Sequence, residues 1–180
     1  MRIISGVYKG KRLYPGKSFK ARPTTDFAKE NLFNVLSNYF DFDDLEVLDL
    51  FSGTGSISYE FASRGCKSVD SVEINSRYHA YITKTAAELG QDQIKTYRAD
   101  AFRFIKHTPR KYNLIFADPP YEMKDIDQIP VMVFESDILQ EGGWLILEHG
   151  KDNEFSKNPN FRELRKYGSV HFSIFEKKKE

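Results

Sequence analysis

The run Asp118-Pro119-Pro120-Tyr121 is the part of the sequence best suited to chemistry, and it directly follows the apolar stretch 114–117. Its two prolines fix their φ angles and lack backbone donors, so the loop should be stiff, with its carbonyl groups available to a ligand. The Asp118 carboxylate and the Pro119 carbonyl are acceptors suited to the two N–H groups of an exocyclic amine. The Tyr121 ring offers a face on which a base can stack. The loop therefore predicts a site for the amino group of a nucleobase.

Such an amine is a poor nucleophile because its lone pair is delocalised into the ring. Hydrogen bonds that hold the amine and compensate the charge developing on nitrogen are then the catalysis to expect. No covalent intermediate is needed.

A glycine turn provides a second candidate site, in the run 47–56 with the sequence Val-Leu-Asp-Leu-Phe-Ser-Gly-Thr-Gly-Ser. Gly53 and Gly55 allow a tight turn and close approach of the backbone to a ligand. Ser58 stands where a third glycine would complete a dinucleotide fingerprint. Asp49 would repel a pyrophosphate but attract an amino group, directly or through water. The turn therefore favours a cofactor with an ammonium group over NAD.

Two further acids end the next two predicted strands. Glu73 lies 20 residues after Gly53, where a carboxylate can accept both hydroxyls of a ribose. Asp100 precedes Ala101 and Phe102, so it either accepts from an adenine amino group beside the Phe102 ring or caps the helix that begins there. Acids at the ends of three successive strands favour one shared ligand site.

Strands and helices must alternate to position these residues. Apolar runs predict strands at 47–51, 69–74, 94–98, 112–117 and 143–148, and residues 162–166 and 169–175 predict a closing hairpin. Helices are predicted at 26–39 and 57–64, up to Gly90, at 101–107, and to about 139 after a loop over 118–130. This alternation predicts an α/β fold with a doubly wound, mostly parallel sheet and an antiparallel strand from the hairpin. Ligands bind such sheets at the carboxyl ends of the strands, where the motifs fall.

Residues 1–25 form a basic extension ahead of a single domain at 26–180. They carry seven Lys and Arg and no acid, whereas the other 155 residues carry 20 basic and 26 acidic side chains. Residues 2–14 predict a small β-hairpin with its basic side chains outward. This asymmetry fits a polyanionic partner and a solvated arm equally well.

The remaining composition excludes several classes of protein. No run approaches the roughly 18 apolar residues of a membrane helix, and no apolar signal core follows the first basic residue, so a cytoplasmic protein without membrane contact is expected. The single Cys66 cannot form an internal disulfide, and the four histidines lack ligand spacing. No bound metal is expected.

Together these motifs resemble the class I amino-methyltransferases, whose DNA and RNA members share an Asp/Asn-Pro-Pro-Tyr/Phe loop. The runs 2–6, 9–13, 22–26 and 30–33 resemble, more narrowly, the bacterial family of 16S rRNA guanine-N2 methyltransferases, which act on guanine 966 of the small-subunit rRNA. The resemblance covers nearly the whole chain. Ser5 stands where that family often has glycine, and Lys29 where it often has arginine.

The resemblance implies a Rossmann-like, seven-stranded sheet, S-adenosylmethionine as methyl donor, and 16S rRNA as partner within a small ribosomal subunit or an assembly intermediate. The residues implied for the cofactor are Thr24, Asp49, Phe51, Ser52, Gly53, Gly55, Glu73, Ile74, Asp100 and Ala101. Those implied for catalysis on the guanine are Asp118, Pro119, Pro120 and Tyr121. RNA contacts are expected from Arg2, Lys9, Lys11, Arg12 and Arg22.

The mechanism implied is in-line transfer of the sulfonium methyl group to guanine N2, with the base turned out of its stack beside Tyr121 and with Asp118 nearest to the leaving proton.

Two alternative functions stay open. One is a DNA adenine or cytosine amino-methyltransferase, which usually needs an added recognition domain. The other is a catalytically idle RNA-binding module of the same fold. A protein glutamine methyltransferase is disfavoured because that group carries asparagine at the position of Asp118. A monomer is expected.

Overall fold

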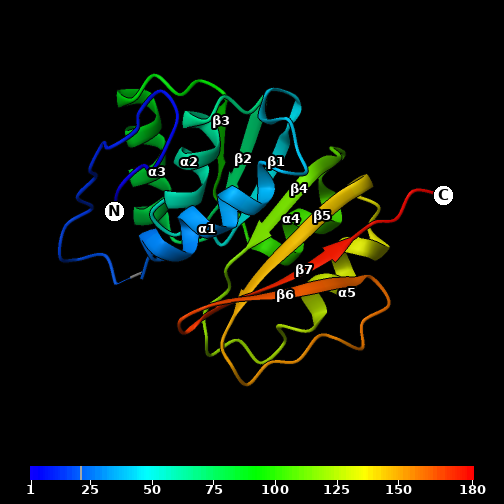
Figure 1. The fold of residues 1–180 in the computed structure, drawn as a ribbon. Coiled ribbons are helices and arrows are strands. Elements are labelled where there is room, and N and C mark those ends of the chain that lie inside the picture. The colour runs from blue at the N-terminus through cyan, green and yellow to red at the C-terminus, as the bar shows by residue number, and fades with distance from the viewer. Residues whose placement is uncertain (21) are drawn as a thin grey trace.

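The computed structural model describes residues 1–20 and 22–180, and a seven-stranded sheet runs through its centre (Figure 1). The strand order is β3-β2-β1-β4-β5-β7-β6. Strands β1 to β5 pair in parallel, whereas β7 lies between β5 and β6 and is antiparallel to both. The strands are β1 (Glu46–Leu50), β2 (Ser68–Val72), β3 (Ile94–Tyr97), β4 (Tyr112–Ala117), β5 (Leu139–His149), β6 (Phe161–Tyr167) and β7 (Val170–Glu176). The predicted fold class is confirmed.

Helices cover both faces of the sheet. On one face lie α1 (Asp26–Leu36), α2 (Ser56–Ser63) and α3 (Ser76–Glu88), and on the other lie α4 (Ala101–His107) and α5 (Gln128–Glu135) (Figure 1). A short 3-10 turn (Phe42–Asp44) leads into β1. Each face has its own apolar cluster, so the central strands are buried on both sides, as their continuous apolar runs predict. In the described part of the chain, no helix is long and apolar enough to cross a membrane.

The helices begin where capping side chains are available. The Thr25 hydroxyl accepts a hydrogen bond from the Ala28 backbone N–H, and Asn75 caps α3 in the same way. α1 ends at Leu36 rather than at the predicted Tyr39, because residues 37–39 turn with shorter-range hydrogen bonds. The bounds predicted for α4 and β4 are confirmed.

The N-terminal segment pairs with itself in antiparallel fashion, as the predicted hairpin requires, but without regular strands. Residues 2 and 12 form a single antiparallel bridge, and no regular strand forms in the described part of this segment. Backbone N–H groups of Ile3, Gly10 and Leu13 donate to the carbonyls of Lys11, Ile3 and Met1, over 2.8 to 2.9 Å. The backbone N–H of Val7 donates to the Ser63 carbonyl of α2, over 2.8 Å, so tertiary contact adds to the local pairing.

Two boundaries near α5 also differ from the prediction. Pro130 lies inside the first turn of α5 rather than at the end of the preceding loop, since the first backbone N–H groups of a helix have no intrahelical partner to lose. β5 begins at Leu139, not Gly143, because Leu139 already pairs with Tyr112 of β4 before an irregularity in the register.

Candidate active site

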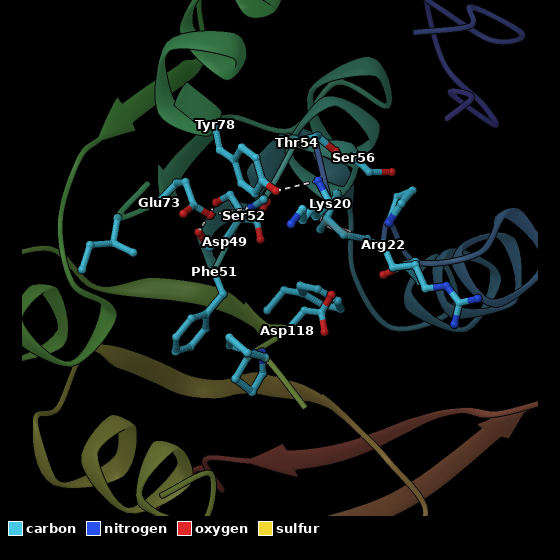
Figure 2. Close-up of a pocket in the computed structure, with 18 of the residues that line it drawn as sticks. Lys20, Arg22, Asp49, Phe51, Ser52, Thr54, Ser56, Glu73, Tyr78 and Asp118 are labelled. Atoms are coloured by element: carbon cyan, nitrogen blue, oxygen red, sulfur yellow. Dashed lines mark hydrogen bonds between the residues drawn. The ribbon is translucent and has the colours of Figure 1, made fainter. Parts of the chain in front are cut away.

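The carboxyl ends of β1, β2 and β4 are aligned beside a cavity of about 480 Å³. Leu50 pairs with both Val72 and Ala117, so the residues that follow these three strands emerge side by side. The end of the N-terminal segment closes another side (Figure 2). The cavity is lined by Lys20, Arg22, Pro23, Thr24, Asp49, Phe51, Ser52, Gly53, Thr54, Ser56, Ile57, Glu73, Ile74, Tyr78, Phe116, Asp118, Pro119, Pro120, Tyr121 and Glu122.

The structure brings most of the predicted site residues together in this cavity. Those that line it are Arg22, Thr24, Asp49, Phe51, Ser52, Gly53, Glu73, Ile74, Asp118, Pro119, Pro120 and Tyr121. Figure 2 shows Asp49, Ser52 and Glu73 close together, with Asp118 set apart from them. Motifs that are far apart in the sequence, from Arg22 to Tyr121, thus share one site.

Other predicted residues do not line the cavity, namely Arg2, Lys9, Lys11, Arg12, Gly55, Asp100 and Ala101. The Asp100 carboxylate caps α4 by accepting from the Arg103 backbone N–H over 2.9 Å. Phe102, two residues later, meets the cavity-lining Phe51 edge to face at 6.5 Å between ring centroids. The first turn of α4 therefore stands next to the cavity without forming its wall. The four basic residues are exposed on the N-terminal segment.

The glycine turn adopts left-handed backbone conformations that residues other than glycine rarely adopt. Phe51, Gly53 and Gly55 all have positive φ angles, of 58°, 56° and 87°. A Cβ added at Gly55 would lie 2.6 Å from the Tyr59 ring, so only glycine fits there. The Gly53 backbone N–H donates to the Glu73 carboxylate over 2.8 Å, which ties the turn to the end of β2.

Asp49 is buried beneath the turn, 1% exposed, at the inner end of the cavity. Its carboxylate accepts a hydrogen bond from the Ser58 hydroxyl over 2.5 Å. Burial raises the pKa of Asp49 from 3.8 to about 7, against the opposing effect of the Ser58 hydrogen bonds. An isolated carboxylate in this position favours a cationic ligand, which would stabilise its charged form.

Asp49→Asn is expected to stabilise the ligand-free protein in a pH-dependent way. The unfolded chain releases the Asp49 proton near pH 3.8 and the folded chain only near pH 7, so the free energy of unfolding falls between these values. Asparagine removes that penalty, and we expect a gain of about 4 kcal/mol near pH 7.5 and only about 1 kcal/mol near pH 4.5. Urea unfolding at both pH values measures the difference. A gain of equal size at both would contradict the assignment.

Asp118 lies near Glu148, an acid outside the cavity lining that the sequence analysis did not identify. The register pairs Ala117 of β4 with Leu147 of β5, so the two acids follow neighbouring positions. Glu148 is 5% exposed and accepts from the Thr24 hydroxyl over 2.7 Å. Burial raises the pKa of Glu148 to about 7, and burial together with the charge of Glu148 raises the pKa of Asp118 well above its usual value.

Tyr121 presents its ring to solvent at the mouth of the cavity, with 64% of the residue exposed. The ring packs over the backbone of Gly150, where an added Cβ would lie 3.6 Å from two ring carbons. An exposed aromatic ring beside a carboxylate pair is suited to stacking on a planar ligand. The site thus offers acceptors for an amine below a stacking surface.

Further residues line the cavity that the sequence analysis did not name as site residues, among them Tyr78, Thr54, Ser56 and Ile57. The Tyr78 hydroxyl accepts from the Lys20 backbone N–H over 2.9 Å, which fixes the N-terminal segment to α3 beside the cavity (Figure 2). Thr54, Ser56 and Ile57 belong to the turn and to the start of α2. Among the described residues, no group of three His, Cys, Asp or Glu side chains is placed to hold a metal ion.

A family model and relatives with known names match nearly the whole chain. A family model described as conserved hypothetical protein 95 matches residues 1–176. A Buchnera aphidicola protein named ribosomal RNA small subunit methyltransferase D is 27% identical over 179 residues, which cover 97% of this chain and 91% of that protein. A Bacillus subtilis protein provisionally named rRNA methyltransferase YlbH is 30% identical, with 99% of this chain and 100% of that protein covered.

Solved structures share the fold. An Escherichia coli protein provisionally named methyltransferase yhhF has a TM-score of 0.85 at 24% identity, covering 100% of this chain and 99% of that one. An RNA methyltransferase from Salinibacter ruber, in complex with S-adenosyl-L-homocysteine, has a TM-score of 0.67 at 16% identity, covering 88% of this chain and 95% of that one.

Proposed function

This chain belongs to the family described as conserved hypothetical protein 95, and from that premise we propose that it transfers a methyl group from S-adenosylmethionine to the N2 amino group of a guanine in small-subunit rRNA. The observation that carries the proposal is the meeting of the Asp118–Tyr121 loop with Asp49 and Glu73 in one cavity. The names of the Buchnera and Bacillus relatives support rRNA as the substrate.

The cavity fits S-adenosylmethionine by its chemistry and its size. At about 480 Å³ it lies in the range of cofactor sites, roughly 300 to 1,000 Å³. We propose that Asp49 and the turn Phe51–Gly55 hold the methionine portion and that Glu73 accepts from the ribose hydroxyls. Asp100 and Ala101 would reach the adenine from the first turn of α4, and Thr24 and Ile74 would line the remaining walls. Bound there, the cofactor supplies an electrophilic methyl group.

The chain's own residues then orient the guanine. Its base stacks on Tyr121 after leaving any helical stack, and its N2 hydrogens are accepted by the Asp118 carboxylate and the Pro119 carbonyl. These acceptors hold the nitrogen lone pair toward the methyl group and compensate the positive charge that develops on nitrogen. The leaving proton passes to Asp118, whose neighbour Glu148 favours proton uptake.

The basic residues of the N-terminal segment enlarge the surface proposed to bind the RNA substrate. Arg22 lines the cavity, and Arg2, Lys9, Lys11 and Arg12 are exposed on the same segment. We propose that they contact rRNA phosphates around the target, within a small ribosomal subunit or an assembly intermediate. The protein is proposed to act as a monomer.

The substrate polymer can be tested directly with methyl-labelled S-adenosylmethionine. Small subunits, large subunits, protein-free 16S rRNA and duplex DNA, all from cells that lack this enzyme, are compared at equal nucleotide concentration. Label is expected in the small subunits at least about tenfold above DNA, since shape and neighbouring ribosomal protein guide RNA recognition. Label mainly in DNA would favour a DNA amino-methyltransferase. Cofactor binding without label in any polymer would favour the idle RNA-binding module.

A further inference from the structure

The first 13 residues are here called the N-terminal arm. The arm runs along α2, from the glycine turn to the end of the helix. At one end the Met1 sulfur lies 3.9 Å from the hydroxyl of Thr54, which lines the cavity. At the other end, the Tyr8 backbone N–H donates to the Ser63 hydroxyl over 3.0 Å. Gly6 crosses α2 so closely that an added Cβ would lie 1.8 Å from the Ser63 carbonyl oxygen. Residues 1–8 of the arm therefore follow α2 from its start to its end.

A buried lysine on α1 joins the arm to the cavity wall. Lys29 is 1% exposed, and its ammonium group donates to the Arg2 carbonyl over 2.6 Å and to the Ser56 hydroxyl over 3.1 Å. Ser56 is the first residue of α2 and lines the cavity. One cation thus bonds the arm and the cofactor site at once.

Glu60, one turn along α2, completes this connection from the other side. It is fully buried, with one carboxylate oxygen 3.5 Å from the Lys29 nitrogen. The carboxylate accepts from the backbone N–H groups of Ile4 and Ser5, over 2.9 and 3.1 Å, and from the Arg64 side chain over 2.9 Å. The arm's backbone is therefore a hydrogen-bonding partner of both members of the ion pair.

A buried ion pair of this kind contributes little net free energy to folding, because both charges lose their hydration. Burial lowers the pKa of Lys29, and the charge of Glu60 only partly offsets that effect. Apolar residues of similar volume often replace a buried ion pair without loss of stability, and the best attested use of buried ions is to fix one arrangement of chain segments. Here the segments fixed are the basic arm, α1 and the start of α2.

We propose that Lys29 and Glu60 are positioning residues that hold the N-terminal arm against the start of α2, so that the cofactor cavity reaches full affinity only when the arm is docked. The inference rests on the proposed function for its ligand, S-adenosylhomocysteine, the product that would leave this cavity. Because coupling between sites is reciprocal, the bound product would in turn hold the arm in place.

Lys29→Met tests this coupling by two readouts. Calorimetric titration with S-adenosylhomocysteine is expected to show an affinity about tenfold lower than in the wild type, within the usual range for coupled sites. Limited trypsin digestion follows cleavage at the exposed Lys9, Lys11 and Arg12. The ligand should slow this cleavage in the wild type and fail to do so in the variant. Lys29→Arg keeps the charge. Its affinity for S-adenosylhomocysteine and its protection from trypsin by the ligand should stay within about threefold of the wild-type values.

Arg110→Met is the matched control. It removes another ion pair with a buried partner, Arg110 to Asp70 at 2.6 Å, just before β4 at the edge of the sheet opposite the cavity. It should lower the melting temperature but leave ligand affinity within about twofold, because it does not touch the arm. If Lys29→Met does not fold, Glu60→Gln replaces it. This variant should lose ligand affinity and ligand protection of the arm in the same way, but to a smaller extent.

Unchanged affinity and unchanged ligand protection of the arm, in folded Lys29→Met or Glu60→Gln, would overturn the inference. So would an equal loss of affinity in Arg110→Met. A wild-type protein that fails to bind S-adenosylhomocysteine would instead contradict the proposed function itself.

Discussion

Asp118→Ala is expected to lower the turnover number for methyl transfer by about 10²- to 10³-fold while leaving the affinity for S-adenosylhomocysteine within about threefold. The loss is large because the carboxylate acts on the guanine amine, where positive charge develops, and alanine offers no acceptor in its place. The effect falls on turnover rather than on cofactor binding because Asp118 lies apart from Asp49 and Glu73 in the cavity (Figure 2). Single-turnover assays with saturating small subunits measure the chemical step.

Asp118→Asn separates hydrogen bonding from charge. The asparagine oxygen can still accept from the amine, but it cannot take up the proton, so a loss of about tenfold is expected, smaller than that of the alanine variant. Full activity in Asp118→Ala would show that the loop holds no catalytic group.

Glu73→Ala is expected to weaken binding of S-adenosylhomocysteine on the order of 100-fold, since hydrogen bonds to a charged carboxylate contribute about 1.5 to 3 kcal/mol each. In the ligand-free structure the two carboxylate oxygens accept from the backbone N–H groups of Gly53 and Asn75, both over 2.8 Å. Each oxygen keeps further acceptor capacity toward a ribose hydroxyl. Alanine removes that capacity and also the acceptor that steadies the glycine turn.

Calorimetric titration of Glu73→Ala measures this loss, with Glu88→Ala on the exposed end of α3 as the control for removing a carboxylate elsewhere. The control should bind as the wild type does. Binding by Glu73→Ala within about threefold of the wild type would show that Glu73 does not contact the ribose.

The main site could be predicted from the sequence because its motifs stand at strand ends. In a parallel sheet the carboxyl ends of neighbouring strands meet at one edge, so the sequence predicts that Asp49, Glu73 and Asp118 lie close together. The order of β1, β2 and β4 brings them together as expected. Asp100 was open to two interpretations, and it caps α4 in the ligand-free structure.

Glu148 could not be predicted as part of the site from its own surroundings. It ends an apolar run, as many structural acids do, and its importance depends on the pairing of β5 with β4. With the strand order known, the alignment of Leu147 with Ala117 would have pointed to it. Long-range pairing of this kind is the information that local sequence patterns lack.

The N-terminal arm shows the same limit more clearly. Its glycines and β-prone residues predict a hairpin, and its two halves do pair, but local patterns give no sign that its backbone also bonds to Glu60 and Ser63, more than 50 residues away. Lys29 stands where the resembling family often has arginine, and the structure buries it between the arm and α2. Both features depend on tertiary contacts that local sequence patterns do not contain.

Identification of the methylated nucleoside tests the central claim most directly. Small ribosomal subunits from cells lacking the enzyme are incubated with the protein and methyl-labelled S-adenosylmethionine, and the digested rRNA is analysed by mass spectrometry. The proposal predicts label as N2-methylguanosine at a single position of the small-subunit rRNA, and loss of that label with Asp118→Ala. Label on a different base, or on a guanine atom other than N2, would contradict it.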